Sequence, residues 1–514
     1  MPAVDIEAPV RVPAAAARDP RVHALRWKTL AVLSLSLLII GLDNTILNVA
    51  LPTLQAEFDA SAATLQWMVD SYLLVFAGLL LLFGALGDRF GRKLALQAGV
   101  TLFGLASLGA LVADSAGQVI AVRALMGVGA ALIMPATLSI IANVFGPEER
   151  GKAIGVWAAL AAVGVGLGPL VGGLLLEWFD WSSVFLVNVP IALIALLLGF
   201  TLVPESRDPR PGAFDVPGAL LSTVGFVLLV YAIIEAPEEG WGSALTLGLL
   251  ATSLAVLAAF VWWERRTPHP MLDLGFFRSA RFSVGTAAVS IAFFSLLGGI
   301  FALTQYLQFA HGYSAIEAGA IMSPLALGLI VGAGSSAKAV ERLGSTRVVT
   351  IGMVAVSVVL ATTLLWAPDT SYALLLVWFF ALALSMGWVM APATEAVVGA
   401  VPEARSGVAS AMNTVARMVA GALGVAVLGS LVSSVYANEL RETAPALPGP
   451  AGAAAEESIG AANAIAAQLP PEAGKPLLAA AGDAYVQAMG VGLGVGAALM
   501  FAGALVVARR LPRR

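Results

Sequence analysis

Cysteine is absent from the 514 residues, and histidine occurs only at His23, His269 and His311. The missing cysteines exclude disulfides, thiolate metal sites and cysteine nucleophiles. Charged residues make up only 12% of the chain, and the net charge of −4 argues against nucleic acid as a partner. We find no nucleotide-binding loop and no cleavable signal peptide in the sequence.

Hydrophobic residues make up 59% of the chain, more than a water-soluble domain of this size can bury. A helix that crosses the hydrocarbon core of a bilayer needs about 20 apolar residues. Stretches of this kind predict an all-α membrane protein with fourteen transmembrane helices, near residues 29–51, 64–85, 94–113, 116–143, 152–176, 183–203, 217–236, 244–263, 281–310, 316–337, 347–366, 372–399, 406–435 and 484–508.

Nearly all positive charge falls in alternate gaps between these stretches. If the amino terminus lies in the cytoplasm, the outer segments carry only Arg441 and Lys475 as basic residues. The positive-inside rule therefore predicts a multi-pass protein of the cytoplasmic membrane with both termini in the cytoplasm. We expect it to act as a monomer in the lipid bilayer.

A short sequence repeats between the helices. An acid, an arginine, an apolar residue and a glycine occur at 88–91 and again at 341–344. One short sequence repeat of this kind can arise by chance, but it favours two six-helix halves with two helices inserted between them. The predicted division is a disordered cytoplasmic tail at 1–28, a first bundle at 29–203, inserted helices at 204–264, a cytoplasmic linker at 265–280, a second bundle at 281–508 with an outer loop at 437–483, and a cytoplasmic tail at 509–514.

The outer loop has two interpretations. Its helix-compatible pieces, such as Ile459 to Gln468, suggest a small hairpin packed over the outer mouth. A loosely ordered connection without function is the alternative.

The turn between the second and third helices is the sharpest motif. Glycines there allow close helix approach, and the acid can cap or pair with basic residues at a neighbouring helix end. Such a contact can form in one conformation and break in another. Topogenic charge alone explains the basic residues, but not the acid or the glycines. The candidate gating residues are Gly84, Asp88, Arg89, Gly91, Arg92 and Lys93.

Three ionisable residues lie inside apolar helices, at Asp43, Asp70 and Arg123. At 1.5 Å per residue, their depths agree within roughly one helical turn, so they could meet. Buried charges cost free energy and are normally kept for function. We expect Asp43 to alternate between a paired and a protonated form, coupled to the position of Arg123. A permanently ionised structural pair is the alternative, and Asp70 could equally contact lipid headgroups.

The fifth helix holds many glycines, which is costly unless close packing or bending is their purpose. No strand precedes them, so a dinucleotide-binding loop is not supported. The residues concerned are Gly155, Gly164, Gly168, Pro169, Gly172 and Gly173.

These residues carry a resemblance. Residues 84–93 resemble the signature of the major facilitator superfamily, and the glycines of the fifth helix resemble its antiporter motif. Residues 42–52 and the segment beginning at Arg123 resemble motifs of the 14-spanning drug:proton antiporters. The resemblance covers nearly the whole chain and includes multidrug and quaternary-ammonium exporters. It implies a role in proton transfer for Arg123, and Asp43, Asp70 and Arg123 together are the candidate proton-coupling residues.

Polar, aromatic and methionine side chains could line an adaptable apolar cavity, although such residues often serve only as packing. The quaternary-ammonium exporters have acids where this chain has Leu329 and Asn413, which weakens the case for strictly cationic substrates. Arg417 favours neutral, zwitterionic or anionic lipophiles, unless it pairs with Glu395 or extends to the interface. The candidate cavity residues are Asn44, Asn48, Phe76, Gln305, Tyr306, Gln308, Met386, Trp388, Asn413 and Arg417.

The sequence therefore predicts a secondary transporter that exports lipophilic small molecules, such as drugs or antibiotics, in exchange for protons by alternating access. It predicts no metal and no cofactor, with protons as the coupling ion. A proton-coupled importer of a small nutrient is the alternative. A membrane-embedded enzyme or sensor is disfavoured, because no His or Cys lies inside a predicted span.

Overall fold

The computed structural model describes residues 20–207, 215–268, 270–401, 406–443 and 450–512. Every regular element in these ranges is helical. Fourteen segments are long and apolar enough to cross a membrane, in agreement with the sequence. They are α1 (Pro20–Phe58), α2 (Ala62–Phe90), α3 (Arg92–Gly109) with η2 (Ala110–Val112), α4 (Ala116–Val144), α5 (Pro147–Trp178), α6 (Ser183–Leu186) with α7 (Asn188–Leu202), α8 (Val216–Glu239), α9 (Ala244–Glu264), α10 (Ala280–Gln305) with η4 (Tyr306–Ala310), α11 (Ala315–Met322) with α12 (Pro324–Leu343), α13 (Ser345–Ala361) with η5 (Thr362–Leu365), α14 (Tyr372–Val398), α15 (Ser406–Thr443) and α18 (Pro471–Arg510). Three short elements complete the chain: η3 (Leu274–Arg278), α16 (Pro450–Glu457) and α17 (Ile459–Gln468).

Two of the spans are broken near a proline. Pro190 cannot donate a backbone hydrogen bond to the carbonyl of Leu186, and α6 ends there before α7 begins. Pro324 is the first residue of α12 and separates it from α11 in the same way. The end of α10 is also irregular, because η4 is a π-helix.

The first helix begins earlier than predicted. Residues 20–28, expected in a disordered tail, are the start of α1, whereas residues 1–19 lie outside the described part. Arg26 Nε donates to Glu149 on α5 at 2.8 Å, and the Trp27 ring packs on Phe145 with 5.2 Å between ring centroids. Because these contacts fix the segment against α4 and α5, it is helical.

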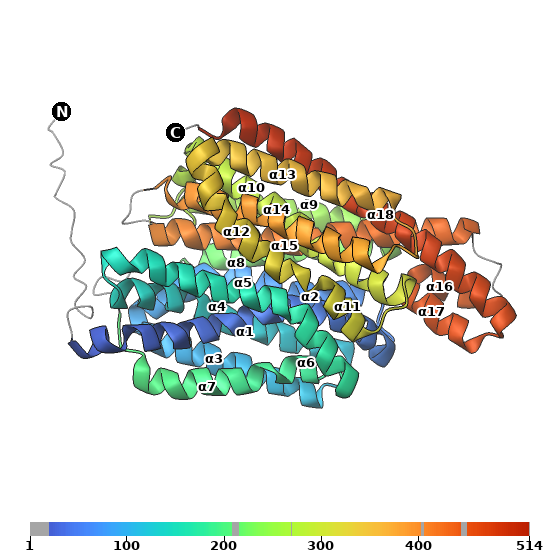
Figure 1. The fold of residues 1–514 in the computed structure, drawn as a ribbon, viewed down its shortest axis with the longest axis horizontal. Helices are drawn as coiled ribbons and strands as arrows, with labels where there is room; N and C mark the ends of the chain where they lie inside the picture. Colours follow the sequence, from blue (N-terminus) through green and yellow to red (C-terminus); the bar gives the residue numbers. More distant parts are fainter. Residues whose placement is uncertain (1–19, 208–214, 269, 402–405, 444–449, 513–514) are drawn as a thin grey trace.

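The helices form two bundles, each with its own apolar core (Figure 1). One core is built mainly from α1 to α7, and the other mainly from α10 to α15 and α18. Helices α8 and α9 pack on each other, and α8 also packs on α2 and α15. This agrees with two six-helix bundles joined by two inserted helices.

The bundles contact each other at the end of the molecule that carries α16 and α17, opposite the start of α1 and the end of α18 (Figure 1). A Cβ added at Gly173 of α5 would lie 2.8 Å from the Cα of Ile316 on α11. A Cβ added at Gly429 of α15 would lie 2.9 Å from the Gln66 side chain on α2. Towards the other end, a Cβ at Gly155 of α5 or Gly334 of α12 would meet no described atom within 4 Å. The bundles are thus closed against each other at one end.

The expected outer loop at 437–483 is helical where the structure describes it. Helix α15 runs on to Thr443, α17 has the bounds of the expected helical piece, and α18 begins at Pro471 rather than near 484. Gln55 Nε2 on α1 donates to Ser458 Oγ at 2.7 Å, and Asn463 Nδ2 donates to the carbonyl of Phe309 at 3.2 Å. The α16–α17 segment therefore contacts both bundles.

Candidate functional site

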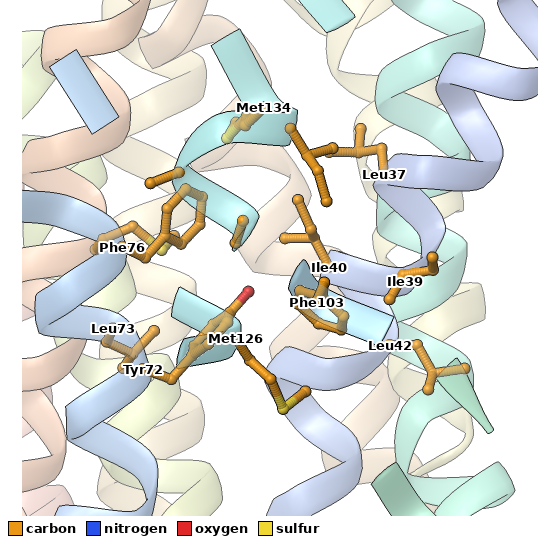
Figure 2. Packing of buried hydrophobic residues seen from close by; sticks show 14 of the residues in the cluster. Leu37, Ile39, Ile40, Leu42, Tyr72, Leu73, Phe76, Phe103, Met126 and Met134 are labelled. Atoms are coloured by element: carbon orange, nitrogen blue, oxygen red, sulfur yellow. The ribbon is translucent and has the colours of Figure 1, made fainter. Parts of the chain in front are cut away.

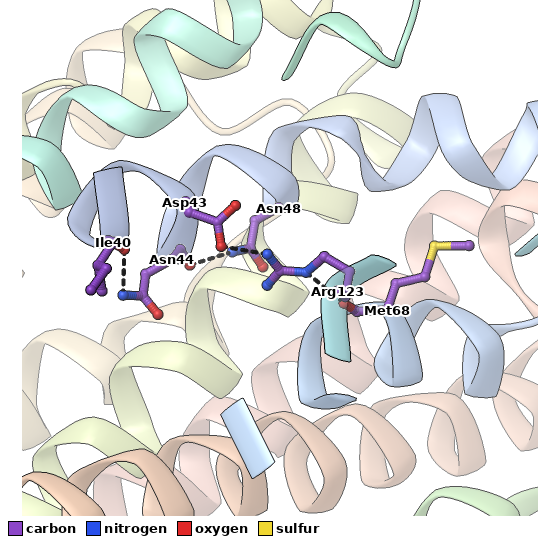
Figure 3. A network of polar contacts seen from close by, with 6 residues as sticks. All are labelled: Ile40, Asp43, Asn44, Asn48, Met68 and Arg123. Atoms are coloured by element: carbon purple, nitrogen blue, oxygen red, sulfur yellow. Dashed lines mark hydrogen bonds and ion pairs between the residues drawn. The ribbon is translucent and has the colours of Figure 1, made fainter. Parts of the chain in front are cut away.

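Asp43 and Arg123 form an ion pair in the centre of the first bundle (Figure 3). Each residue is 1% exposed. Arg123 Nη1 donates to Asp43 Oδ2, and its Nε donates to the carbonyl of Met68 at 3.0 Å. The guanidinium also lies over the Tyr72 ring, 4.3 Å from its centroid. Removing two charges from water is tolerated here because each charge finds its partner.

Apolar side chains surround this pair. Figure 2 shows buried side chains of α1, α2 and α4, among them Ile40, Tyr72, Phe76 and Met126, and of these Tyr72 contacts Arg123. Tyr72 and Phe76 lie with ring centroids 5.8 Å apart, and both are buried. The Tyr72 hydroxyl makes no hydrogen bond with a described residue. The pair therefore lies in a medium of low polarity, where gaining or losing a proton has large electrostatic consequences.

Asp70 is separate from this pair. It is fully buried on α2, and neither carboxyl oxygen accepts a hydrogen bond from a described residue. The alternative that Asp70 contacts lipid headgroups is therefore wrong. Of the three expected residues, the structure brings Asp43 and Arg123 into contact and leaves Asp70 without a bond to either.

Asn44 and Asn48 extend from the same helix as Asp43. Asn44 Nδ2 donates to the carbonyl of Ile40 at 2.7 Å, and Asn48 Nδ2 donates to the carbonyl of Asn44 at 3.3 Å (Figure 3). Both Oδ1 atoms are buried without a hydrogen-bond partner among the described residues. Each amide therefore keeps a free acceptor inside the bundle.

The glycines of α5 form a close seam with α1 next to Asp43. Added Cβ atoms at Gly164 and Gly168 would lie 2.8 and 2.9 Å from the carbonyl oxygens of Leu38 and Leu42. One at Gly172 would lie 2.9 Å from Ile46, so the three glycines follow the same face. Two other residues of the motif face the second bundle: Pro169 lies against Gly319, and Gly173 lies against Ile316. Gly155 takes no part in either contact.

The turn between α2 and α3 contains the expected pairing of Asp88. Arg92 Nε donates to Asp88 Oδ1 at 2.7 Å, and Gly91 has φ +129°, a backbone conformation that favours glycine. Lys93 Nζ donates to the carbonyl of Phe200 at 2.8 Å. The neighbouring motif residues are Gly84, where an added Cβ would lie 3.3 Å from Pro135, and Arg89, whose guanidinium lies 5.8 Å from the centroid of the Phe90 ring.

Three candidate cavity residues belong to the packing of the second bundle. The Tyr306 hydroxyl donates to the carbonyl of Ala367 at 2.9 Å, Trp388 Nε1 donates to Ser335 Oγ at 2.9 Å, and Met386 is fully buried. Both bonds lie within one bundle. The role of these three residues in lining a substrate cavity stays a prediction.

Gln305 and Gln308 lie where the bundles meet. Gln308 Nε2 donates to the carbonyl of Val49 on α1 at 2.9 Å. Gln305 lines a cavity of only ≈ 10 Å³, room for about one water molecule, together with residues of α15, α17 and α18. This small cavity is not large enough for a lipophilic substrate.

Arg417 lies on α15 with its guanidinium 4.8 Å from the centroid of the Phe293 ring on α10. Its Nε is buried and makes no hydrogen bond with a described residue. The Oδ1 atom of Asn413, one turn earlier, is likewise buried and without a partner in the described part. A donor and an acceptor are thus left free on one helix.

A family model for the Major Facilitator Superfamily matches residues 33–425, which include the Asp43–Arg123 pair and both glycine motifs. The chain belongs to this superfamily. Its members are secondary transporters, so the protein is a multi-pass transporter and not an enzyme. Among the described residues, no group of three His, Cys, Asp or Glu side chains is placed to hold a metal ion.

Known relatives match more than nine-tenths of the chain. It is 39% identical to the multidrug efflux pump LfrA of Mycolicibacterium smegmatis, over 95% of this chain and 96% of that one. It is 34% identical to the tetracenomycin C resistance and export protein of Streptomyces glaucescens, over 93% and 90%. A solved bacterial homologue of the human lysosomal transporter Spinster, inward-facing and unoccupied, shares the fold with a TM-score of 0.65 and 19% identity, covering 95% and 98%.

Asn188 is a residue of the site that the sequence interpretation missed. It is fully buried at the start of α7 and lies close to the Asp43 carboxylate, but neither its Nδ2 nor its Oδ1 makes a hydrogen bond with a described residue. A polar residue within an apolar span, two positions before a proline, was the signal that could have indicated it.

Proposed function

We propose that the protein exports lipophilic small molecules, such as drugs or antibiotics, across the cytoplasmic membrane in exchange for protons by alternating access. The buried Asp43–Arg123 pair beside the α1–α5 seam is the observation that carries the proposal. A proton on Asp43 breaks this pair, and the helix that holds Asp43 is the one on which the glycines of α5 pack. The names of LfrA and of the tetracenomycin C exporter support export of drug-like molecules.

The arrangement described here corresponds to the inward-facing state, with both termini in the cytoplasm. The bundles meet at the end that carries α16 and α17, which is then the outer end. In the outward-facing state this contact opens, and the turn at Asp88 and Arg92 comes to meet the second bundle. The same proposal includes the domain boundaries predicted above, except for the start of α1. It also includes the monomeric state and the use of no cofactor.

Asp70 carries a proton in this state. A buried carboxylate without a hydrogen-bond donor or a cation costs several kcal/mol, whereas the neutral acid does not. Asp43, by contrast, is ionised against Arg123. In this state Asp70 is thus neutral and Asp43 is ionised. The protein can therefore keep a proton on Asp70 while Asp43 is paired with Arg123.

The substrate is bound between the bundles when they separate, near Asn44, Asn48, Asn413 and Arg417. The free acceptors and the Arg417 guanidinium suit molecules that combine an aromatic body with carbonyl or anionic groups. The same proposed substrate cavity includes Gln305, Gln308 and Phe76. Purely cationic substrates gain nothing from Arg417.

Transport by purified protein in proteoliposomes tests this function. We expect an imposed proton gradient to drive accumulation of a fluorescent lipophilic dye by the wild type, and the Asp43→Asn variant to bind the dye but not to accumulate it. Asp369→Asn, an exposed acid between η5 and α14, is the control and keeps full activity. Accumulation by Asp43→Asn at the wild-type rate would refute the coupling role.

The same assay separates export from import. In inside-out vesicles an exporter accumulates dye when the lumen is acidified, and in right-side-out cells it lowers the dye content. Proton-driven uptake of a polar nutrient into right-side-out cells would instead establish the importer alternative.

A further inference from the structure

Two acidic residues of the inserted helices lie face to face, far from Asp43 in sequence. Asp215 is the N-cap of α8, and Glu264 is the last residue of α9. They are 8% and 4% exposed, so both carboxyl groups are buried. Nothing in the transport scheme above uses them.

Backbone and indole N–H groups surround these carboxyl groups. Asp215 Oδ1 accepts from Gly218 N at 2.9 Å and from Trp263 Nε1 at 2.7 Å, and its Oδ2 accepts from Met271 N at 3.4 Å. Glu264 Oε2 accepts from Leu272 N at 2.9 Å. Both acids therefore hold the linker between α9 and α10 through Met271 and Leu272.

One oxygen of the pair receives no donor. Glu264 Oε1 is buried and makes no hydrogen bond with an N–H or O–H group of a described residue. A Cβ added at Gly218 would lie 2.6 Å from Glu264 Oε1 and 2.5 Å from Asp215 Oδ2. The two oxygens thus converge on the same point above a glycine, where no side chain separates them.

Two ionised carboxylates in this position would repel each other. Asp215 is the charged side chain that acts most strongly on Glu264. The nearby Arg266 guanidinium lies over the Trp262 ring at 4.5 Å, and Asp273 caps η3 by accepting from Gly275 N. A metal ion would need oxygen ligands, but the groups that point at the pair are N–H donors, which repel a cation.

We propose that Asp215 and Glu264 share one proton, held on Glu264 Oε1 and donated to Asp215 Oδ2, and that this proton fastens the linker to the inserted helices. Asp215 is the ionised acceptor of this hydrogen bond, because each of its oxygens already uses a lone pair to accept a hydrogen bond from an N–H group. The linker leads through η3 into α10, the first helix of the second bundle. Loss of the proton separates the acids and frees the linker, so alkaline pH loosens the tether between the inserted helices and the second bundle.

The chain has no cysteine, so one introduced thiol reports on the linker alone. The Met271→Cys variant keeps the backbone N–H that bonds to Asp215. We measure its alkylation by a water-soluble maleimide in proteoliposomes at increasing pH. Each rate is divided by that of the same thiol in a Glu264→Gln background, which cancels the titration of the thiol itself.

The glutamine amide donates to Asp215 at every pH and mimics the protonated acid. We expect the rate ratio to stay near one at about pH 6 and to rise roughly tenfold by about pH 9, as the carboxyl pair loses its proton. The Asp215→Asn variant places an amide N–H against other donors, and its linker thiol reacts fast at all pH values.

Glu239→Gln, which removes an exposed acid at the far end of α8, is the matched control and leaves the pH profile unchanged. A ratio that does not change with pH would overturn the proposal. So would a fast, pH-independent reaction in Glu264→Gln. Because the readout is linker accessibility, its failure is distinguishable from failure of the transport function.

Discussion

In the first bundle α5 packs on α1 through Gly164, Gly168 and Gly172, and in the second bundle α15 packs on α10 through Gly421 and Gly424. An added Cβ at Gly424 would lie 2.8 Å from the Cα of Phe294, as close as those in the first seam. These are the fifth and first helices of each half. The two halves thus repeat the same close helix contact, which permits sliding or rocking without a change in side-chain packing.

The charges beside the two seams differ. In the first bundle Asp43 is paired with Arg123 beside the seam, and Asp70 is buried nearby on α2. In the second bundle α10 has no acid, and Arg417 contacts the Phe293 ring. The close helix contact is thus duplicated, whereas the buried acids beside it belong to the first half. In the transport scheme proposed above, the first half handles the proton and the second half contributes to substrate choice.

The largest expected difference between the two bundles concerns the loss of stability when a buried charged residue is replaced. Asp43→Asn leaves Arg123 buried without its partner, which should cost about 3–5 kcal/mol, and adding Arg123→Gln should recover most of that loss. Arg417→Gln should cost no more than about 1 kcal/mol, because only a cation–π contact is lost. Thermal unfolding in detergent measures both. Equal losses for Asp43→Asn and Arg417→Gln would contradict the one-sided placement of charge.

The two glycine seams, α1–α5 and α10–α15, should lose similar stability when a glycine is replaced by alanine. Gly168→Ala and Gly424→Ala each place a methyl group against backbone of the facing helix, and each should destabilise by about 1–3 kcal/mol. Gly155→Ala on α5 and Gly299→Ala on α10 are the matched controls, because an added Cβ at either position would have no neighbour within 4 Å, and they should be neutral or slightly stabilising. A loss in only one bundle would show that the seams are not equivalent.

Substrate choice should depend on the second half. Arg417→Gln should lower transport of an anionic or carbonyl-rich dye about tenfold relative to a cationic dye, because a charged hydrogen-bond donor is lost. Proton coupling should remain, as judged by the dependence of the rate on an imposed gradient. A uniform decrease for both dyes would argue against a role in selectivity.

The smallest effects are expected at the two equivalent turns. Gly91 and Gly344 have φ +129° and +82°, so Gly91→Ala and Gly344→Ala should each cost about 1 kcal/mol in thermal unfolding. Gly242→Ala, at a glycine without positive φ and without close neighbours, is the control. If the two substitutions lower the free energy of unfolding by different amounts, the two turns are alike in sequence but not in their contribution to stability.

Much of this architecture could be predicted from the sequence. Apolar length predicted fourteen spans, and the glycine spacing of α5 predicted a close helix contact. The start of α1 at Pro20 could not be predicted, because Arg26 and Trp27 become ordered only through contacts with α4 and α5.

The site was predicted in part. Helical rise placed Asp43 and Arg123 at similar depth, and they do pair. The same reasoning could not show that Asp70 makes no hydrogen bond with this pair, because depth along a helix says nothing about rotation around its axis. That Tyr306, Met386 and Trp388 line a substrate cavity stays a prediction.

The sequence by itself determined that the chain crosses a membrane many times and which residues are too costly to bury without purpose, since both follow from the transfer of side chains out of water. Only the tertiary structure decided which of those residues meet. Asp215 and Glu264 approach each other from separate helices, as do Asn188 and Asp43, and both arrangements depend on packing angles that no local pattern encodes.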